Sequence, residues 1–355
     1  MKVVLLAPTP PPAGGIASWT VRMQNATLKN GWKVEVVDEK LLGNREVFGG
    51  KTNKNLLMEI KRCIRIWKDL INSLKDDDVK VVHSCIPAST LGMLREYVCA
   101  HISKFNRKKF IIHYRCTIPN MCTSKIGKTV FKLLTNKSDL VIALNSQSMD
   151  FAKTYSETPV MVIPNFIEKS AISNNNSKKN SERVKRILYV GGVIKSKGCE
   201  DIIKVAWEFP NINFRFVGNI DPEVYNQSIP QNVEFCGEKN KLEVRQEMIE
   251  ADIFMFVSYF PGEGFSNALA EAMASGLPCI ASDWAANKDM LEEEGGIIVP
   301  IKDTVKMKRA IELLQNNKDL RNSQSNWNIS KVKRYYTEKI VTDMYVNEYE
   351  KLTKL

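Results

Sequence analysis

The segment Ala251–Trp284 places the strongest constraint on what this chain can fold into. Its first part, Ile253–Val257, is a short apolar run of strand-favouring residues, which predicts a buried parallel strand. A proline and two glycines follow, and Ser266–Ser275 then predicts a helix that stops at a glycine. A strand, a glycine-rich loop and a helix in this order direct backbone amides and the positive end of a helix at an anion. The segment therefore predicts an α/β fold with an anion site.

Two glutamates make this prediction more specific. Glu263 lies in the loop, and Glu271 lies in the helix on the same face as Asn267, one turn earlier. A carboxylate has two acceptor oxygens, so Glu271 could accept both hydroxyls of a ribose while Glu263 accepts from another hydroxyl. The alternative is that both acids are solvated and the loop is only a turn. The run of alanines after a glycine-flanked acid favours the binding site.

The stretch from Glu263 to Gly276 closely resembles the Glu-x7-Glu signature of the retaining family 4 glycosyltransferases, which have the GT-B fold. The resemblance implies a nucleotide-sugar donor held by the C-terminal domain. Glu271 would bind the ribose, and Glu263 would lie near the sugar and the diphosphate. The intervening residues would complete this part of the donor site: Gly264, Phe265, Ser266 and Asn267.

Strand-like apolar runs recur along the whole chain. The first half predicts strands at Lys2–Ala7, Lys33–Val37, Val79–His83, Lys109–His113, Leu140–Leu144 and Val160–Ile163. The second half predicts strands at Ile187–Val190, Asn213–Val217, Val233–Phe235, Ile253–Val257 and Pro278–Ala281. Strands that alternate with helices predict parallel, doubly wound sheets, and 355 residues are enough for two domains.

The family resemblance implies how these domains are arranged. We expect two Rossmann-like domains facing a cleft, with a C-terminal helix that crosses back to the first domain. The expected boundaries are an acceptor-binding domain at 1–165, a polar linker at 166–186, a nucleotide-sugar-binding domain at 187–330 and the crossover helix at 331–355.

A second glycine turn carries a candidate diphosphate contact. After the strand at Ile187–Val190 come Gly191 and Gly192, and then Lys195 and Lys197 ahead of a helix. A lysine before a helix N-terminus offers a point charge to a diphosphate, and Lys197 with the next glycine matches the family's Lys-Gly pair. The family usually carries an arginine where this chain has Gly192. Either Lys195 supplies that charge, or helix amides do.

Two further loops are assigned by resemblance. Gly14 and Gly15 follow the first strand and resemble the family's N-terminal glycine loop, which contacts the donor. The turn Cys236–Lys239, with Glu238 in it, would lie near the base of the nucleotide.

Histidines are few, and two follow or end predicted strands. His83 has two open interpretations, a working side chain or a buried core ring. His113 ends a strand at the edge where doubly wound sheets bind ligands, and the resemblance places it beside the donor sugar. Arg115 shares that edge and could meet an anionic group. The implied catalytic set is therefore Glu263, His113 and Lys197.

Other ligand and targeting signals are weak. The eight cysteines lack metal-ligand spacing, which favours a reducing cytoplasm, and we expect neither a metal nor another cofactor. The acidic run Asp76–Asp78 is interpreted as a solvated loop. Apolar runs are too short for a membrane span, and Met1–Ala7 is interpreted as a strand and not as a signal peptide.

The net charge of +11 is concentrated in the first half: residues 1–165 carry +12 and the rest carries −1. No nucleic-acid-binding motif accompanies this charge, so an anionic membrane is the favoured partner, unless the charge only keeps the surface soluble. The predicted helix Lys54–Lys75 has basic residues beside an apolar stripe of Leu57, Ile60, Ile64, Trp67, Ile71 and Leu74. The stripe could enter a membrane or pack on the protein's own sheet.

With the charge distribution, the family resemblance implies a retaining hexosyl transfer from a UDP- or GDP-sugar to a hydroxyl of a glycan acceptor. Candidate acceptors are polyprenyl-diphosphate-linked glycans of lipopolysaccharide or capsule biosynthesis. Lys197 and the amides after Glu263 would stabilise the leaving diphosphate. The expected location is the cytoplasm, and a peripheral position at the inner face of the plasma membrane is left open. A nucleotide-sugar epimerase and a non-catalytic sugar-nucleotide-binding protein remain alternatives.

Overall fold

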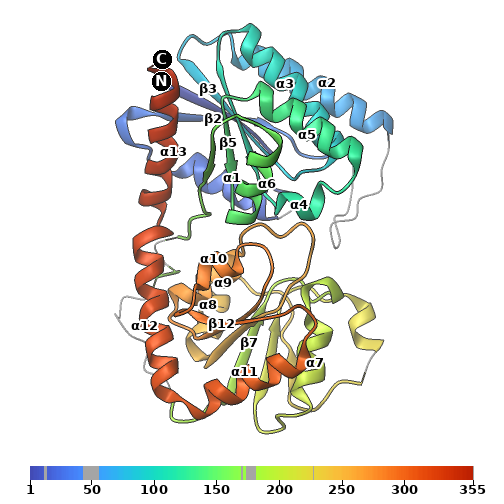
Figure 1. The fold of residues 1–355 in the computed structure, drawn as a ribbon, viewed down its shortest axis with the longest axis vertical. Coiled ribbons are helices and arrows are strands. Elements are labelled where there is room, and N and C mark those ends of the chain that lie inside the picture. Colours follow the sequence, from blue (N-terminus) through green and yellow to red (C-terminus); the bar gives the residue numbers. More distant parts are fainter. Residues whose placement is uncertain (12–13, 43–55, 169–170, 173–180, 227, 355) are drawn as a thin grey trace. The chain divides into compact units, whose positions relative to one another are not determined.

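The computed structural model describes residues 1–11, 14–42, 56–168, 171–172, 181–226 and 228–354 (Figure 1). These residues form two compact units: unit 1 comprises Met1–Asn165 with Glu338–Leu355, and unit 2 comprises Phe166–Thr337. Residues 169–170 and 173–180 of the expected linker and residues 54–55 of the expected helix lie outside the described residues.

Unit 1 contains a six-stranded parallel sheet with the order β2-β1-β3-β4-β5-β6. The strands are β1 (Lys2–Ala7), β2 (Lys33–Asp38), β3 (Val79–Ile86), β4 (Lys109–Tyr114), β5 (Leu140–Ala143) and β6 (Val160–Val162). Each coincides with a predicted strand, because strands covered on both faces are continuous apolar runs in the sequence. The sheet therefore confirms the α/β prediction for the first half of the chain.

Helices cover both faces of this sheet (Figure 1). One face carries the main apolar core of the unit, against α2 (Leu56–Ser73), α3 (Thr90–Phe105) and α5 (Lys125–Lys137). The other face packs against α1 (Gly15–Asn25) and α13 (Glu338–Thr353). The remaining elements are α4 (Ile118–Met121), α6 (Ser146–Tyr155) and a 3₁₀ turn at Lys29–Gly31.

Unit 2 contains a second six-stranded parallel sheet, with the order β12-β11-β10-β7-β8-β9. Its strands are β7 (Arg186–Val190), β8 (Asn213–Val217), β9 (Val233–Phe235), β10 (Ile253–Phe256), β11 (Cys279–Ser282) and β12 (Gly296–Val299). Read from β9, this is the 3-2-1-4-5-6 order of dinucleotide-binding folds. Strand β12 was not predicted from the sequence, because two glycines and a short apolar run are a weak strand signal.

Helices of unit 2 alternate with its strands. They are α7 (Cys199–Ala206), α8 (Lys241–Glu250), α9 (Asn267–Ala274), α10 (Asn287–Leu291), α11 (Thr304–Asn316) and α12 (Lys318–Tyr335), with 3₁₀ turns at Lys195–Lys197 and Pro222–Asn226. Helices between consecutive parallel strands are the crossover connections that such a sheet requires.

The C-terminal region differs from the expected single helix at 331–355. Helix α12 ends at Tyr335 in unit 2, and α13 begins at Glu338 in unit 1. Between them, Thr337 forms a β-bridge with Ile167, and the Tyr336 carbonyl accepts a hydrogen bond of 2.9 Å from the Ile167 amide. A backbone group that bonds a bridge partner cannot also continue the helical ladder, so the helix breaks there. The return of the terminal helix to the first domain is nevertheless as expected.

Candidate functional site

The candidate site of unit 2 lies where the strand order reverses. Strand β7 lies between β8 and β10. The chain that leaves β7 continues to β8 on one side of it, whereas β10 pairs with β7 on the other side. In doubly wound sheets, ligands bind beyond the carboxyl ends of the strands at such a reversal. The loop after β7 carries Lys197, and the loop after β10 carries Glu263. Two predicted site residues from distant segments thus meet at one edge.

Lys197 and Glu263 form a salt bridge of 2.6 Å between Nζ and Oε2. Their side chains are only 20% and 11% exposed. Ser258 Oγ donates to the same carboxylate oxygen at 3.4 Å. The Lys197 ammonium also lies 5.2 Å from the ring centre of Phe260, within the range of a cation–π attraction. The lysine is therefore held in a defined position by charge and by an aromatic face.

Gly198 makes this meeting of the two loops sterically feasible. It has φ +77°, and a Cβ added there would lie 2.4 Å from the Val257 carbonyl oxygen. Beside it, the Tyr259 amide donates to the Ser196 carbonyl at 2.9 Å. Only glycine combines this conformation with this close approach. The family-like Lys-Gly pair therefore has a local structural reason: the glycine lets the lysine's loop pack on the end of β10.

The residues between the two signature glutamates build the start of α9. Ser266 is the N-cap, and its buried Oγ accepts from the Leu269 amide at 3.1 Å. Phe265 is buried, with its ring edge-on to Tyr336 at 5.3 Å between centres, and Gly264 is buried beside it. These side chains shape the loop, and their contact with a donor stays a prediction.

A pocket of about 200 Å³ lies beside α8 and α9 at the end of β7. Glu271, the expected ribose acid, lines it and is partly buried, as is Asn267 one turn earlier. The pocket carries both signs of charge along an apolar floor, and its lining residues are Glu168, Ala171, Val190, Lys239, Lys241, Leu242, Val244, Arg245, Met248, Glu271 and Ser275. A half-buried carboxylate in a concave pocket is a suitable acceptor for a diol.

Sequence reasoning found only part of this lining. Lys239 belongs to the turn expected near the base, whereas its neighbour Glu238 is exposed. Lys241 and Arg245, at the start of α8, were not anticipated. The sequence signal that could have located them is the capping box of Asn240 and Glu243, because it marks where helix α8 begins.

The residues expected to compensate for the missing arginine lie on the surface. Lys195 is 71% exposed, and its Nζ lies 3.5 Å from Glu200 Oε2. Gly192 is exposed, and its carbonyl accepts from Tyr189 Oη at 2.8 Å, while Gly191 has φ +147°. The structure therefore holds Lys197 in the site, and compensation by Lys195 stays a prediction.

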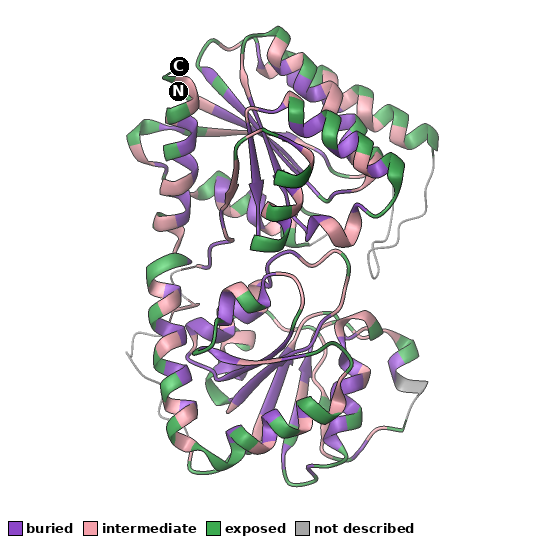
Figure 2. Ribbon diagram, in the orientation of Figure 1, coloured by how far each residue is buried: buried purple, intermediate pink, exposed green. Residues whose placement is uncertain are grey.

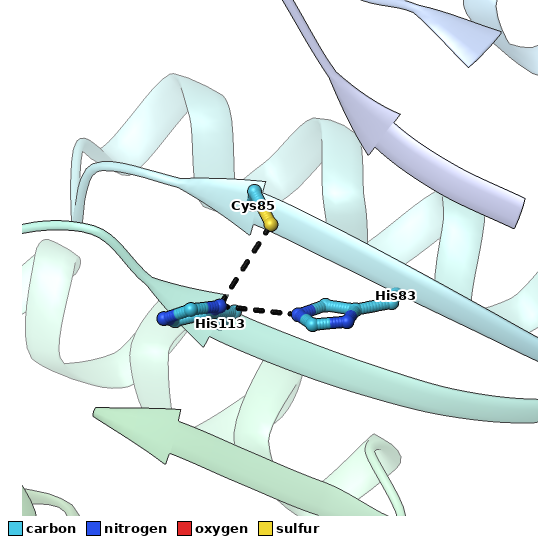
Figure 3. A group of neighbouring side chains, drawn as sticks. All are labelled: His83, Cys85 and His113. Carbon is cyan, nitrogen blue, oxygen red and sulfur yellow. Dashed lines mark hydrogen bonds between the residues drawn. The ribbon is translucent and has the colours of Figure 1, made fainter. Parts of the chain in front are cut away.

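In unit 1, His113 belongs to a fully buried polar cluster (Figure 3). Its Nδ1 lies 3.1 Å from His83 Nε2 and 3.9 Å from Cys85 Sγ. Its Nε2 accepts from Arg115 Nη1 at 3.2 Å, and His83 Nδ1 lies 2.7 Å from Tyr349 Oη. His83 is thus a buried core ring, which is one of the two interpretations that the sequence left open. A catalytic role for His113 stays a prediction, because its ring nitrogens bond within the protein.

The hydrogen-bond directions in this cluster follow from Arg115. A guanidinium can only donate, so His113 Nε2 must accept and its hydrogen lies on Nδ1. His113 then donates to His83, and His83 donates to Tyr349 on α13. Burial, and then the charge of Arg115, lower the pKa of His83 to about 3 and the pKa of His113 well below its ordinary value. Both rings are thus neutral.

His83, Cys85 and His113 lie close enough to share a metal ion, but their surroundings do not fit a cation. The Arg115 guanidinium bonds directly to His113 and would repel a cation. Burial raises the pKa of the Cys85 thiol, which disfavours the thiolate that binds metals. We assign no metal to this cluster.

Gly14 and Gly15 lie at the start of α1, where both are exposed. Gly14 has an extended backbone, with φ −175°, and neither glycine has a neighbour that a Cβ would touch. The same helix places Trp19 on the histidine cluster, with Arg115 stacked at 4.6 Å. The open space at the glycines is compatible with their expected role, which stays a prediction.

Comparison with known proteins supports this description of unit 2. Residues 171–330 match the family model of the glycosyl transferases group 1. A relative from Streptococcus pneumoniae, alpha-galactosylglucosyldiacylglycerol synthase, is 29% identical over 183 residues, which are 48% of this chain and 46% of the relative. The match thus spans under half of that relative's length.

Solved structures are similar over the whole chain. Sucrose-phosphate synthase from Thermosynechococcus elongatus has a TM-score of 0.80 at 17% identity, covering 99% of this chain and 98% of that one. HepE of Anabaena in complex with UDP has a TM-score of 0.73 at 15% identity and covers 100% of both. The chain therefore has the GT-B fold, and most of its second unit, residues 171–330, is similar to the group 1 glycosyltransferases.

Proposed function

We propose that this protein is a retaining glycosyltransferase that binds a nucleotide-diphosphate sugar in unit 2. The observation that carries the proposal is the salt bridge of Lys197 and Glu263 at the strand-order reversal, together with Glu271 in the nearby pocket. These residues lie within the segment similar to group 1 glycosyltransferases. HepE, a neighbour in fold, is bound to UDP, so a UDP-sugar is the first donor to test and a GDP-sugar the second.

Each residue has a chemical role in this proposal. Glu271 accepts the ribose hydroxyls. Lys197 binds the diphosphate, whose negative charge grows as the bond to the sugar breaks, so a fixed cation lowers the barrier to transfer. An ammonium has three hydrogens, so Lys197 can keep its bond to Glu263 while it binds a phosphate oxygen. Glu263 accepts from a sugar hydroxyl.

The acceptor is proposed to be a hydroxyl of a lipid-linked glycan that unit 1 binds, in surface-polysaccharide biosynthesis. The excess positive charge of residues 1–165 suits an anionic lipid carrier such as a polyprenyl diphosphate. The name of the pneumococcal relative describes a sugar-bearing diacylglycerol as its product. Among the described residues, no helix is long and apolar enough to cross a membrane. We therefore propose a peripheral position at the cytoplasmic face of the membrane.

Metal independence is part of the same proposal. Lys197 already provides a positive charge at the expected diphosphate position, so the reaction is proposed to need no divalent cation.

Thermal unfolding in the presence of UDP, UDP-glucose, UDP-galactose and GDP-mannose tests donor binding. A ligand that binds only the folded state stabilises it by about 2.7 kcal/mol at a hundredfold excess over Kd, and this stabilisation raises Tm. Glu271→Ala should abolish the rise. Glu208→Ala, an exposed acid of the same unit, is the control and should keep it. A chain whose Tm responds to none of these ligands contradicts the proposal.

Incubation with the stabilising donor then tests the reaction. A glycosyltransferase needs an acceptor for productive turnover, whereas an epimerase converts the donor alone. Recovery of an isomerised sugar nucleotide without acceptor would identify the protein as an epimerase instead.

A further inference from the structure

The outer sides of α2, α3 and α5 in unit 1 form a surface with many exposed residues (Figure 2), and a large share of these exposed side chains are apolar. We call this surface the outer face. It holds half of the large exposed apolar side chains among the described residues: Leu56, Leu57, Ile60, Ile64, Ile71, Leu91, Leu94, Phe105, Ile126 and Leu133. Exposed apolar side chains gathered on neighbouring helices in this way indicate an interaction site.

Helix α2 cannot easily turn this apolar side inward, because its opposite side is anchored. Arg62 Nε donates to the Glu39 carbonyl at 2.8 Å, and Arg65 Nη2 donates to the Asp38 carbonyl at 3.0 Å. Ile66 is buried in the main core one turn further on. The two arginines that the sequence places beside the apolar stripe therefore hold the helix to the end of β2.

The expected apolar stripe of this helix divides between the two interpretations that the sequence left open. Trp67 packs against the core, and its Nε1 donates to the Arg95 carbonyl at 3.4 Å, while Leu74 is buried. The stripe residues Ile60 and Ile64, in contrast, are 48% and 56% exposed. The packed-helix interpretation therefore holds for Trp67 and Leu74, whereas Ile60 and Ile64 lie on the outer face.

Basic residues are interspersed among the exposed apolar side chains. Lys61 and Lys68 are exposed on α2, and Lys125 and Lys132 are exposed on α5. Within the bounds given for α2, α3 and α5, Asp69 is the one exposed acidic residue. Apolar side chains can enter the acyl boundary while lysines bind headgroup phosphates, so this pattern complements an anionic lipid surface. A symmetric contact with a second copy would instead place like charges against each other.

We propose that the outer face docks this protein on an anionic lipid surface through the exposed sides of α2, α3 and α5. The inference deepens the proposed function and rests on it for its purpose, since docking would bring unit 1 to a lipid-linked acceptor. The docking itself requires neither donor nor acceptor, so it can be tested separately.

Cosedimentation with vesicles tests the proposal. The wild-type chain is mixed with vesicles of phosphatidylcholine alone or of phosphatidylcholine with phosphatidylglycerol, at low and at high salt. Binding should require phosphatidylglycerol and should weaken with salt, because screening shortens the range of the attraction. The double variant Lys61→Gln/Lys68→Gln should bind at least about tenfold more weakly, because each basic residue near the surface contributes about fivefold.

Apolar variants distinguish docking from attraction by charge alone. Ile60→Ser/Ile64→Ser should also bind about tenfold more weakly or worse, with an unchanged Tm, because both side chains are already exposed. Matched controls lie on α11 of unit 2, where Val305→Ser/Leu313→Ser and Lys306→Gln change exposed residues of the same kinds and should leave binding unchanged.

Several outcomes overturn the proposal. They are failure of the wild-type chain to sediment with phosphatidylglycerol vesicles, equal binding to neutral vesicles, and wild-type binding by both α2 double variants. A dimer in sedimentation equilibrium that Ile60→Ser/Ile64→Ser dissociates, without vesicle binding, would assign the outer face to self-association. The nucleotide-induced rise in Tm is measured on the same variants, so a failure of donor binding is seen separately from a failure of docking.

Discussion

Both units have ionisable residues near the carboxyl ends of their strands, but the two groups of residues differ in burial and charge. In unit 2, Lys197 and Glu263 form a salt bridge and are partly exposed. In unit 1, His83, His113 and Arg115 are enclosed by aromatic rings, and the two histidines are neutral. The unit 1 cluster lies on and just after β3 and β4, and the unit 2 pair lies in the loops after β7 and β10; in both units these strands neighbour a reversal of strand order.

The difference shows that a position at the end of a parallel strand does not by itself define a ligand site. In unit 1, the hydrogen bond from His83 to Tyr349 and the contact of Tyr345 with both rings attach α13 to the sheet. In unit 2, the side chains of Lys197 and Glu263 stay 20% and 11% exposed, so the charged pair can meet a ligand. The first cluster joins α13 to the sheet, and the catalytic roles predicted for His113, Lys197 and Glu263 stay predictions.

The largest expected effect is acid destabilisation through unit 1. The pKa of His83 is about 3 in the folded chain and about 6.5 in the unfolded chain, so the unfolded chain binds more protons between these values. Stability is therefore fully present above pH 6.5 and falls as the pH falls toward 3, by about 1.4 kcal/mol per pH unit for each buried histidine. Urea unfolding at a series of pH values measures this slope.

Histidine variants make this prediction specific to the cluster. His83→Gln should remove about half of the histidine-linked slope, whereas His101→Gln, which changes the exposed third histidine, should leave it unchanged. A slope that His83→Gln does not alter would show that the buried cluster is not the pH-sensitive element.

The next largest effect is expected at the charged pair of unit 2. Glu263→Gln removes the acceptor charge assigned to the donor sugar, and loss of one such contact in a transition state typically lowers kcat about 100- to 1000-fold. Affinity for UDP should stay the same or increase, because Lys197 loses its carboxylate partner and keeps its charge. Steady-state kinetics and calorimetry with UDP check both parts, and equal losses of turnover and UDP affinity would place Glu263 on the nucleotide.

The two lysines of the β7 loop should differ. Lys197→Ala should weaken UDP binding by about 1.5 to 3 kcal/mol and leave uridine binding nearly unchanged, because a charged hydrogen bond to phosphate is lost. Lys195→Ala should cost under about 0.5 kcal/mol, since its side chain is 71% exposed. Comparable losses for the two variants would show that Lys195 replaces the arginine absent at Gly192.

The smallest expected effect is that of metal removal. If Lys197 supplies the positive charge that the diphosphate needs, transfer should continue unchanged in EDTA. Activity that EDTA abolishes and Mg²⁺ restores would refute metal independence and would leave the assignments of Glu263 and Glu271 to be tested by their own variants.

Local sequence was a sufficient guide where structure follows from local physics. Strand β8 at Asn213–Val217 and strand β9 at Val233–Phe235 match their predicted bounds, because short apolar runs between turn residues favour buried strands. Strand β12 and the break at Tyr336 could not be found in this way. The first has a weak signal, and the second depends on a bridge to Ile167, 170 positions earlier in the chain.

By itself, the sequence determined the α/β class, the two sheets and the candidate site residues of unit 2, because apolar periodicity, glycine turns and the spacing of Glu263 and Glu271 are encoded by neighbouring residues. Tertiary structure alone decided that Lys197 bonds Glu263, that His113 is sealed from solvent, and that Ile60 and Ile64 lie outside while Trp67 lies inside. Each of these outcomes depends on strand pairing or helix packing between segments far apart in the chain, whose free energies no local pattern records.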